Sequence, residues 1–310
     1  MTEAIIAQVG QLLEQHLKNS KAKKTPALNQ QAPEIIAQEL LLKERIKEGF
    51  QGQDDLLAFV KTYLTHTNHL THPHYMGHQV AVPHDLSGIP ELIHGTINNP
   101  SSLYEMGPAG GTCEGFMINW MLEKIGWLEG RDDYDFHFTP GKASGVLTHG
   151  GSVANLTALA AARAAIAPDA WTDGNPNDLV VIGAASAHYS IARALSILGL
   201  GKKAFYPVAV DENEVLLMED LPRVYAKAMA DGKRVMCVVA NACATSTGLF
   251  DPIDAMGDFC QENNLWFHVD GAHGAAALAG PQSKQYVKGI EKARSLIWDA
   301  HKMMRVPALC

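Results

Sequence analysis

The chain has 310 residues, of which 47% are hydrophobic and 19% are charged, as in an ordinary globular protein of one or two domains. Its formal net charge of −8 argues against nucleic-acid binding, which needs a basic face. No run of about 20 uncharged apolar residues occurs, so no membrane span is predicted. The five cysteines are scattered and form no C-x-x-C pair, which indicates a reduced, cytoplasmic protein.

The first part of the chain is predicted to be helical. Apolar residues recur at helical spacing from Ile5 to Leu17, which predicts an amphipathic helix. Residues 20–33 are polar and contain two prolines, so they indicate a linker. Further helices are expected at about 34–48 and 54–64. We expect residues 1–85 to form an N-terminal helical segment and residues 86–310 to form a large domain.

From about residue 140, short β-branched runs alternate with helical patterns. Strands are expected at residues 145–148, 179–183, 204–210, 235–240, 265–269 and 295–298. Helices are expected at residues 152–166, 189–198, 221–230 and 254–262. This alternation predicts an α/β fold with a mostly parallel sheet. Ligands of such sheets bind beyond the carboxyl ends of the strands, so the residues directly after each strand are the candidate site.

A glycine-rich turn, THGGSVAN, follows the first of these expected strands at Thr148–Asn155. Glycines let the backbone approach a ligand closely, and the N-terminus of the following helix suits a phosphate. The alternative is an ordinary turn in which Ser152 caps the helix. The turn is therefore a candidate phosphate site, and by itself it is not decisive.

Two titratable residues follow later strands. His188 comes after the apolar run LVVIG and could stack on a flat ring or move a proton, or it could be an ordinary loop residue. Asp270 ends a buried apolar run, where a carboxylate is costly unless it meets a cation. A protonated heterocyclic nitrogen would satisfy Asp270, and so would a buried arginine or a metal.

Lys302 lies in DAHK, one β-unit after Asp270. A lysine at a strand end in an apolar setting can act as an amine nucleophile, although an isolated lysine is more often a surface residue with a buried stem. A phosphate site, a stacking histidine, an aspartate and a Schiff-base lysine together indicate pyridoxal phosphate.

Five motifs carry a resemblance to a known family. The sequence resembles the group II pyridoxal-phosphate-dependent amino acid decarboxylases, such as the glutamate, aromatic-L-amino-acid, histidine and diaminobutyrate decarboxylases. The likeness runs from about His72 to the end and is strongest in GVLTHGGSVANLTALAAARA, SAHYSIARA, ATSTGLFDPI, HVDGAHG and DAHK. It implies a fold-type I transferase-like large domain, with a mostly parallel seven-stranded-type sheet flanked by helices, after an N-terminal helical segment.

The resemblance also implies roles around the cofactor ring. Lys302 would hold the cofactor as a Schiff base, and Asp270 would keep the pyridine nitrogen protonated. His188 and Ala272 would pack on opposite faces of the ring. Thr245 would form a hydrogen bond near the ring substituents. Lys302, His188 and Asp270 are the expected catalytic residues.

The same resemblance assigns the phosphate side of the cofactor. Gly150, Gly151 and Ser152 would bind the phosphate through backbone N–H groups and the hydroxyl. His301 and Asp299 would close this side of the site.

A histidine-rich segment, HTNHLTHPHYMGH, holds five histidines in thirteen residues. We expect no metal there, because no cysteine or carboxylate is interleaved with the histidines. By resemblance, Tyr75, His78 and Tyr104 are candidate substrate contacts. The alternative is that they only pack the junction between the two parts of the chain.

The expected function is a carboxy-lyase that removes the α-carboxylate of an L-amino acid as CO₂ and gives an amine. The alternatives are another fold-type I reaction, as in aminotransferases or cysteine-desulfurase-like lyases, and a non-catalytic truncated paralogue. The family has a C-terminal small domain that we expect to be absent here, so the chain is expected to be a poorly active fragment. A homodimer wrapped by residues 1–85 is also expected.

Overall fold

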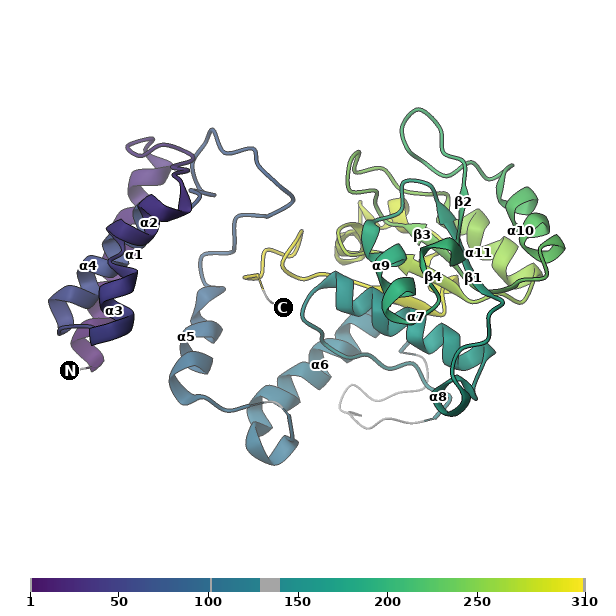
Figure 1. Cartoon of the computed structure of the whole chain (residues 1–310), viewed down its shortest axis with the longest axis horizontal. Helices are drawn as coiled ribbons and strands as arrows, with labels where there is room; N and C mark the ends of the chain where they lie inside the picture. Colours follow the sequence, from purple (N-terminus) through teal and green to yellow (C-terminus); the bar gives the residue numbers. More distant parts are fainter. Residues whose placement is uncertain (1, 101, 129–139, 309–310) are drawn as a thin grey trace. The chain divides into compact units, whose positions relative to one another are not determined.

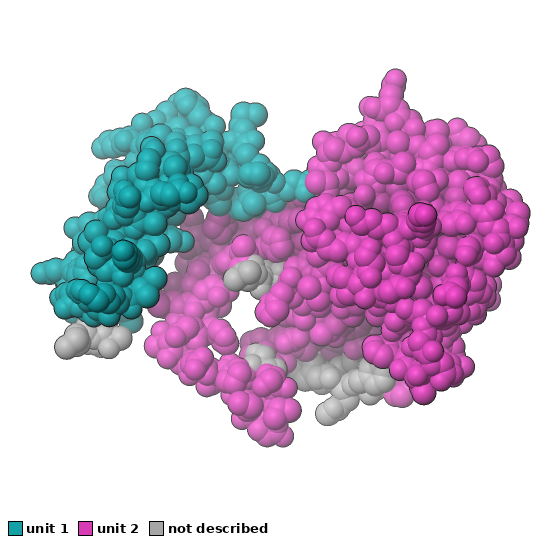
Figure 2. Space-filling model, viewed as in Figure 1, with its two compact units in different colours: residues 1–82 teal, residues 83–310 magenta. Residues whose placement is uncertain are grey.

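The computed structural model describes residues 2–100, 102–128 and 140–308. The chain divides into two compact units, residues 1–82 and residues 83–310, which Figure 2 draws in different colours. The second of these units begins at Pro83. No helix in the described ranges is both long enough and apolar enough to cross a membrane.

The first unit is built from helices. They are α1 (Thr2–Lys21), α2 (Pro33–Glu39), α3 (Leu42–Glu48) and α4 (Gln53–Thr65). Helices α1 and α4 pack side by side (Figure 1). The single helix expected at 34–48 is wrong, because Leu41 has a left-handed φ of 49° and separates α2 from α3. The buried Leu40 and the bond from the Arg45 guanidinium to the Leu40 carbonyl hold this break.

The second unit contains a parallel sheet. Its strands are β1 (Leu179–Ala184), β2 (Phe205–Val208), β3 (Arg234–Asn241), β4 (Phe267–Asp270) and β5 (Ser295–Ile297). All neighbours pair in parallel in the order β2-β1-β3-β4-β5. The described residues thus give a five-stranded sheet, smaller than the seven-stranded type that we expected.

The strand expected at residues 145–148 is also wrong, because these residues have no regular secondary structure. Val146 and Leu147 are more than half exposed. The Leu147 N–H donates to Glu114 Oε1 at 3.4 Å instead of joining a strand ladder. An apolar run that finds no neighbouring strand does not form a sheet, whatever its propensity.

Helices cover both faces of the sheet. The helices of the second unit are α5 (Gly88–Ile97), α6 (Pro108–Ile125), α7 (Gly151–Ile166), α8 (Ala170–Asp173), α9 (Tyr189–Ile197), α10 (Leu221–Ala230) and α11 (Ile253–Glu262), of which α7, α9, α10 and α11 cover the sheet. Short 3₁₀ helices lie at Tyr104–Met106, Lys202–Ala204, Gly274–Ala279, Lys284–Val287 and Ile290–Lys292. Helices α7 and α9 pack together on one face, and α10 and α11 cover the other (Figure 1), as right-handed crossovers require for this strand order.

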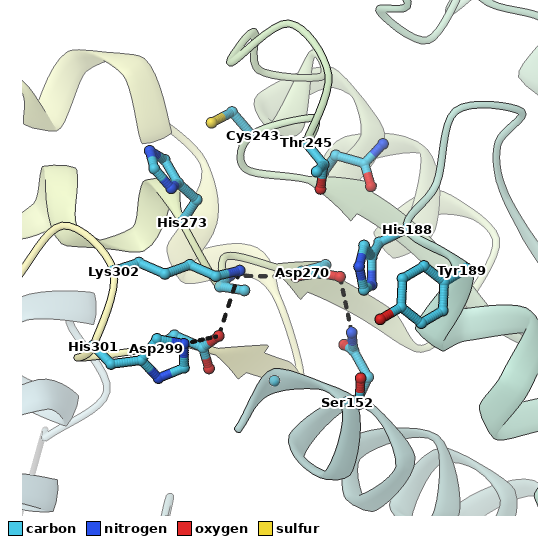
Figure 3. A pocket seen from close by; sticks show the side chains of 14 residues that line it. Ser152, His188, Tyr189, Cys243, Thr245, Asp270, His273, Asp299, His301 and Lys302 are labelled. Carbon is cyan, nitrogen blue, oxygen red and sulfur yellow. Dashed lines mark hydrogen bonds and ion pairs between the residues drawn. The ribbon is translucent and has the colours of Figure 1, made fainter. Parts of the chain in front are cut away.

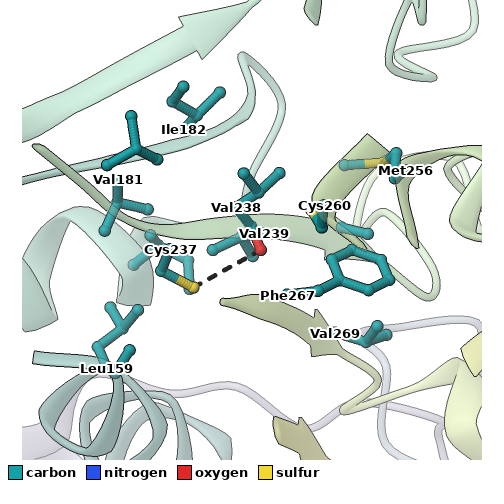
Figure 4. Close-up of a cluster of buried hydrophobic side chains, with 14 of the residues drawn as sticks. Leu159, Val181, Ile182, Cys237, Val238, Val239, Met256, Cys260, Phe267 and Val269 are labelled. Carbon is teal, nitrogen blue, oxygen red and sulfur yellow. Dashed lines mark hydrogen bonds between the residues drawn. The ribbon is translucent and has the colours of Figure 1, made fainter. Parts of the chain in front are cut away.

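The strands are buried on both faces, as is typical of parallel sheets. In Figure 4, valines of β1 and β3 lie between Leu159 of α7 and the side chains of Met256 and Cys260 of α11. Phe267 of β4 is 1% exposed and belongs to the same core. Because Asn241 pairs with Asp270, and Asp270 pairs with Ile297, the carboxyl ends of β3, β4 and β5 meet at one edge of the sheet.

Candidate active site

A pocket of about 220 Å³ lies at this edge of the sheet. This volume is below the roughly 300–1,000 Å³ of pockets for drug-sized ligands, so the pocket suits one compact molecule. All of the expected cofactor residues except Gly150 line it, and Figure 3 shows most of them: Gly151, Ser152, His188, Thr245, Asp270, Ala272, Asp299, His301 and Lys302. The pocket therefore brings together residues from four strand ends and one helix N-terminus.

The N-terminus of α7 forms one side of the pocket. Gly150 precedes the helix with a φ of +86°, a conformation that favours glycine. A Cβ atom at Gly151 would lie only 2.9 Å from Asp299 Oδ2, so a side chain there would collide with the segment after β5. Gly151 therefore lets the helix start close against Asp299.

Asp270 is the last residue of β4 and is 7% exposed. Its Oδ2 accepts a hydrogen bond from Asn155 Nδ2 at 2.8 Å, and its Oδ1 accepts one from the Ala272 N–H at 3.2 Å. Both donors are neutral, and Asp270 forms no ion pair with any described residue. A buried carboxylate with neutral partners leaves its charge available to a cation in the pocket.

His188 caps α9 and lines the pocket beside Tyr189. Its Nδ1 lies 2.7 Å from Ser190 Oγ. Burial lowers the pKa of His188, and the charge of Asp270 partly opposes this shift. The ring is therefore neutral at pH 7 and presents an aromatic face rather than a fixed positive charge.

Lys302 lies in the turn after β5, and its side chain extends into the pocket (Figure 3). Its Nζ is 3.4 Å from Asp299 Oδ2, and His301 Nε2 is 3.7 Å from the same oxygen. Asp299 is buried, with 6% exposure. The carboxylate thus gathers two basic side chains beside the N-terminus of α7.

The pocket also has lining residues that the sequence did not single out: Asn155, Tyr189, Asn241, Cys243 and His273. Burial raises the pKa of the Cys243 thiol. Burial, and then the charge of Lys302, lower the pKa of His273. Asn155 stands four residues after Gly151 on α7, so helical spacing could have placed both on one face.

The expected substrate contacts do not line this pocket. Tyr104 lies in a 3₁₀ helix and is 65% exposed. Tyr75 and His78 belong to the first unit, and His78 has a left-handed φ of 53°. Among the described residues no cluster of metal-binding side chains occurs. The role of these three residues remains a prediction.

Comparisons with known proteins agree with this arrangement. Residues 44–310 match the family model described as the pyridoxal-dependent decarboxylase conserved domain. An acidic amino acid decarboxylase of Xenopus tropicalis is 29% identical over 301 residues, which are 95% of this chain and 56% of the relative. The cysteine sulfinic acid decarboxylase of Mus musculus is 29% identical over 282 residues, covering 90% of this chain and 54% of that protein.

A solved structure gives the same result. The crystal structure of mouse CSAD is 26% identical, with a TM-score of 0.87, and the match covers 100% of this chain and 62% of that one. The chain spans about half the length of the curated relatives that it matches. Its fold is that of the fold-type I decarboxylases, as the resemblance implied. The chain belongs to the pyridoxal-dependent decarboxylase family.

Proposed function

We propose that the chain carries the cofactor-binding part of a carboxy-lyase that removes the α-carboxylate of an L-amino acid as CO₂ and gives an amine. One observation carries the proposal. The buried Asp270 carboxylate has only neutral hydrogen-bond donors and faces a pocket that also contains the Lys302 amine. A protonated pyridine nitrogen is a cation that this carboxylate could bind, and the family match supports that cofactor.

The pocket fits the ring of pyridoxal phosphate. Asp270 would hold the pyridine nitrogen and keep its proton in place. Ala272 is small and nearly buried, so a flat ring could lie against it, with His188 on the opposite face. Thr245 would bind near the ring substituents. When bound, the cofactor supplies an electron sink for the electron pair left by the departing carboxylate.

The N-terminus of α7 fits the phosphate. Gly150 precedes this 16-residue helix and Gly151 and Ser152 begin it, and the N–H groups of a helix N-terminus favour an anion. The Asp299 carboxylate lies beside this helix N-terminus. Lys302 Nζ and His301 Nε2 both lie within 4 Å of that carboxylate. We propose that Asp299 orients these two side chains, and that His301 faces the phosphate.

Lys302 would do two things in the reaction. Its amine would hold the cofactor covalently and would be released when the amino group of the substrate takes its place in that bond. Once displaced, the amine could hold a proton near the reacting carbon, because Asp299 keeps Nζ at 3.4 Å from its carboxylate.

We further propose that the substrate contacts include Tyr75, His78 and Tyr104, as the resemblance implies. Two of the similar relatives are named for acidic amino acids, so acidic L-amino acids are the first substrates to test. The protein is also proposed to be a cytoplasmic homodimer in which residues 1–85 pack on the partner. Exposed apolar side chains of this segment, such as Ile46 at 86%, and the free cysteines support this proposal.

The test is CO₂ release from a panel of acidic, aromatic and basic L-amino acids, in the presence of added pyridoxal phosphate. We expect release from at least one amino acid, and loss of at least 1,000-fold of the rate in Lys302→Ala, an order of magnitude typical for removal of a covalent catalyst. Lys203→Ala, at an exposed 3₁₀ turn, is the matched control. Equal rates in the two variants would refute the role of Lys302.

A further inference from the structure

A continuous set of hydrogen bonds lies beneath the pocket. Trp266 Nε1 donates to Ser295 Oγ at 2.8 Å. The same hydroxyl lies 2.9 Å from His268 Nδ1, and the Ser295 carbonyl oxygen lies 3.2 Å from that nitrogen. On the other side of the ring, His268 Nε2 lies 2.9 Å from Asn155 Oδ1. These bonds connect the strands β4 and β5 to helix α7.

Asn155 continues the network in two directions. Its Nδ2 donates to Asp270 Oδ2 at 2.8 Å and to Ser190 Oγ at 2.9 Å. Ser190 Oγ lies 2.7 Å from His188 Nδ1. One amide therefore links the two pocket residues that face the proposed cofactor ring, Asp270 and His188.

The ends of the network fix the direction of its first half. An indole N–H can only donate, so Ser295 Oγ accepts from Trp266 and its own hydrogen can point to His268 Nδ1. At the other end a carboxylate can only accept, so the amide nitrogen of Asn155 must face Asp270. The amide oxygen then faces His268, which must carry its hydrogen on Nε2.

The same reasoning fixes the second half. Ser190 Oγ accepts one hydrogen from Asn155, so its own hydrogen is free to be donated to His188 Nδ1. The backbone N–H of Ser190 also points at this nitrogen, at 3.3 Å. Two donors on Nδ1 leave the ring hydrogen of His188 on Nε2.

Burial makes these bonds difficult to replace. Asn155 and Ser190 are 1% exposed and His268 is fully buried. Burial also lowers the pKa of His268 to about 4, against the opposing charge of Asp270, which agrees with a neutral ring. A lost bond within this set leaves a buried polar atom unsatisfied.

We infer that Asn155 and His268 are positioning residues, which fix the orientation of the Asp270 carboxylate and place the hydrogen of His188 on Nε2. They act through Asp270 and His188. Asn155 also lines the pocket, whereas His268 does not. The expected effect on cofactor affinity rests on the proposed function. The positions of the ring hydrogens of His268 and His188 do not rest on it, because they are set by contacts within the protein.

The first test uses cofactor-free protein with ¹⁵N-labelled histidine at neutral pH. Ring ¹⁵N chemical shifts distinguish the two neutral tautomers and the charged form, and His268→Gln and His188→Gln assign the signals by their loss. We expect His268 and His188 each to carry a single hydrogen on Nε2. A hydrogen on Nδ1, or a charged ring at either position, would overturn the inference whether or not the chain binds pyridoxal phosphate.

The second test compares His268→Gln with His268→Leu by titration with pyridoxal phosphate. Glutamine can donate to Asn155 and accept from Ser295, so its affinity should stay within about threefold of the wild type. Leucine leaves both partners unsatisfied, and the affinity should fall about tenfold or more. Equal affinity of a folded leucine variant and the wild type would contradict the positioning role. If leucine prevents folding, the ring tautomers of the first test still decide.

Wild-type protein that does not bind pyridoxal phosphate would count against the proposed function and not against the inference. In that case the ring tautomers alone decide whether the network is oriented as described.

Discussion

At the scale of single residues, the site depends on which groups are buried and on what they meet. Asp270, His268 and Asn155 are all buried within one hydrogen-bonded set. A buried histidine that stays neutral makes the free energy of unfolding depend on pH, because the unfolded chain binds a proton that the folded chain does not bind. His268 is the clearest example, with a pKa lowered from 6.5 to about 4 by burial.

We therefore predict that the free energy of unfolding falls between pH 6.5 and pH 4. In this range the unfolded form of His268 is protonated and the folded form is neutral, so the contribution is complete above pH 6.5 and is lost as the pH falls. Urea unfolding at several pH values measures it. The glutamine of His268→Gln cannot titrate, so the free energy of unfolding of this variant should change less with pH over this range. The other histidines are present in both proteins and contribute equally to both curves. Parallel curves for the two proteins would be inconsistent with a neutral buried His268.

Some residues of the candidate site could be predicted from the sequence, and others could not. Lys302, Asp270 and His188 were found because each carries its own chemistry at a strand end. Asn155 was missed, although it lies inside the glycine-rich motif, because its importance comes from Asp270, which is 115 residues away in the chain. His268 was missed for the same reason, since a histidine in an apolar strand shows its role only through its partners.

At the scale of elements, local patterns predicted most helices and strands of the second unit. The expected helix at 221–230 is observed as α10 with the same bounds, and β1 extends the expected strand at 179–183 by one residue. The break at Leu41 and the unpaired segment 145–148 were not predictable from periodicity. The first depends on a left-handed residue, and in the second the segment pairs with no strand among the described residues.

Close packing of a turn on a helix gives an element-scale prediction. Gly289 has a φ of +85°, and a Cβ there would lie 2.4 Å from the Asp254 Cα of α11. Gly248 has a φ of +72° but has nothing within 4 Å of such a Cβ. Gly248→Ala should cost about 1–2 kcal/mol of unfolding free energy from backbone strain alone. Gly289→Ala should cost about 1–3 kcal/mol more, because the backbone of α11 must move.

Thermal and urea unfolding of the two variants measure this difference. Equal destabilisation would mean that the turn can relax away from α11 and that the contact with Asp254 is not a constraint. A larger loss at Gly289 would show that the 3₁₀ segment after it is held against α11. The ion pairs from Asp254 to Lys288 and Lys292, at 2.6 Å each, lie across the same contact.

At the scale of the whole molecule, a parallel sheet places distant residues at one edge, and this property makes the site possible. Residues 151–302 supply the pocket, while residues 1–82 form a separate compact unit. The family, the fold and the cofactor could be predicted from five short motifs. The size of the sheet could not, since the described residues pair into five strands and the resemblance implied seven.

The central claim is that the pocket binds pyridoxal phosphate through Lys302. The most direct measurement is mass spectrometry of the chain after incubation with pyridoxal phosphate and reduction with borohydride. We predict a single reduced adduct on the peptide that contains Lys302, and no adduct at that position in Lys302→Ala. An adduct spread over exposed lysines such as Lys203 and Lys288, with Lys302 unmodified, would contradict the claim.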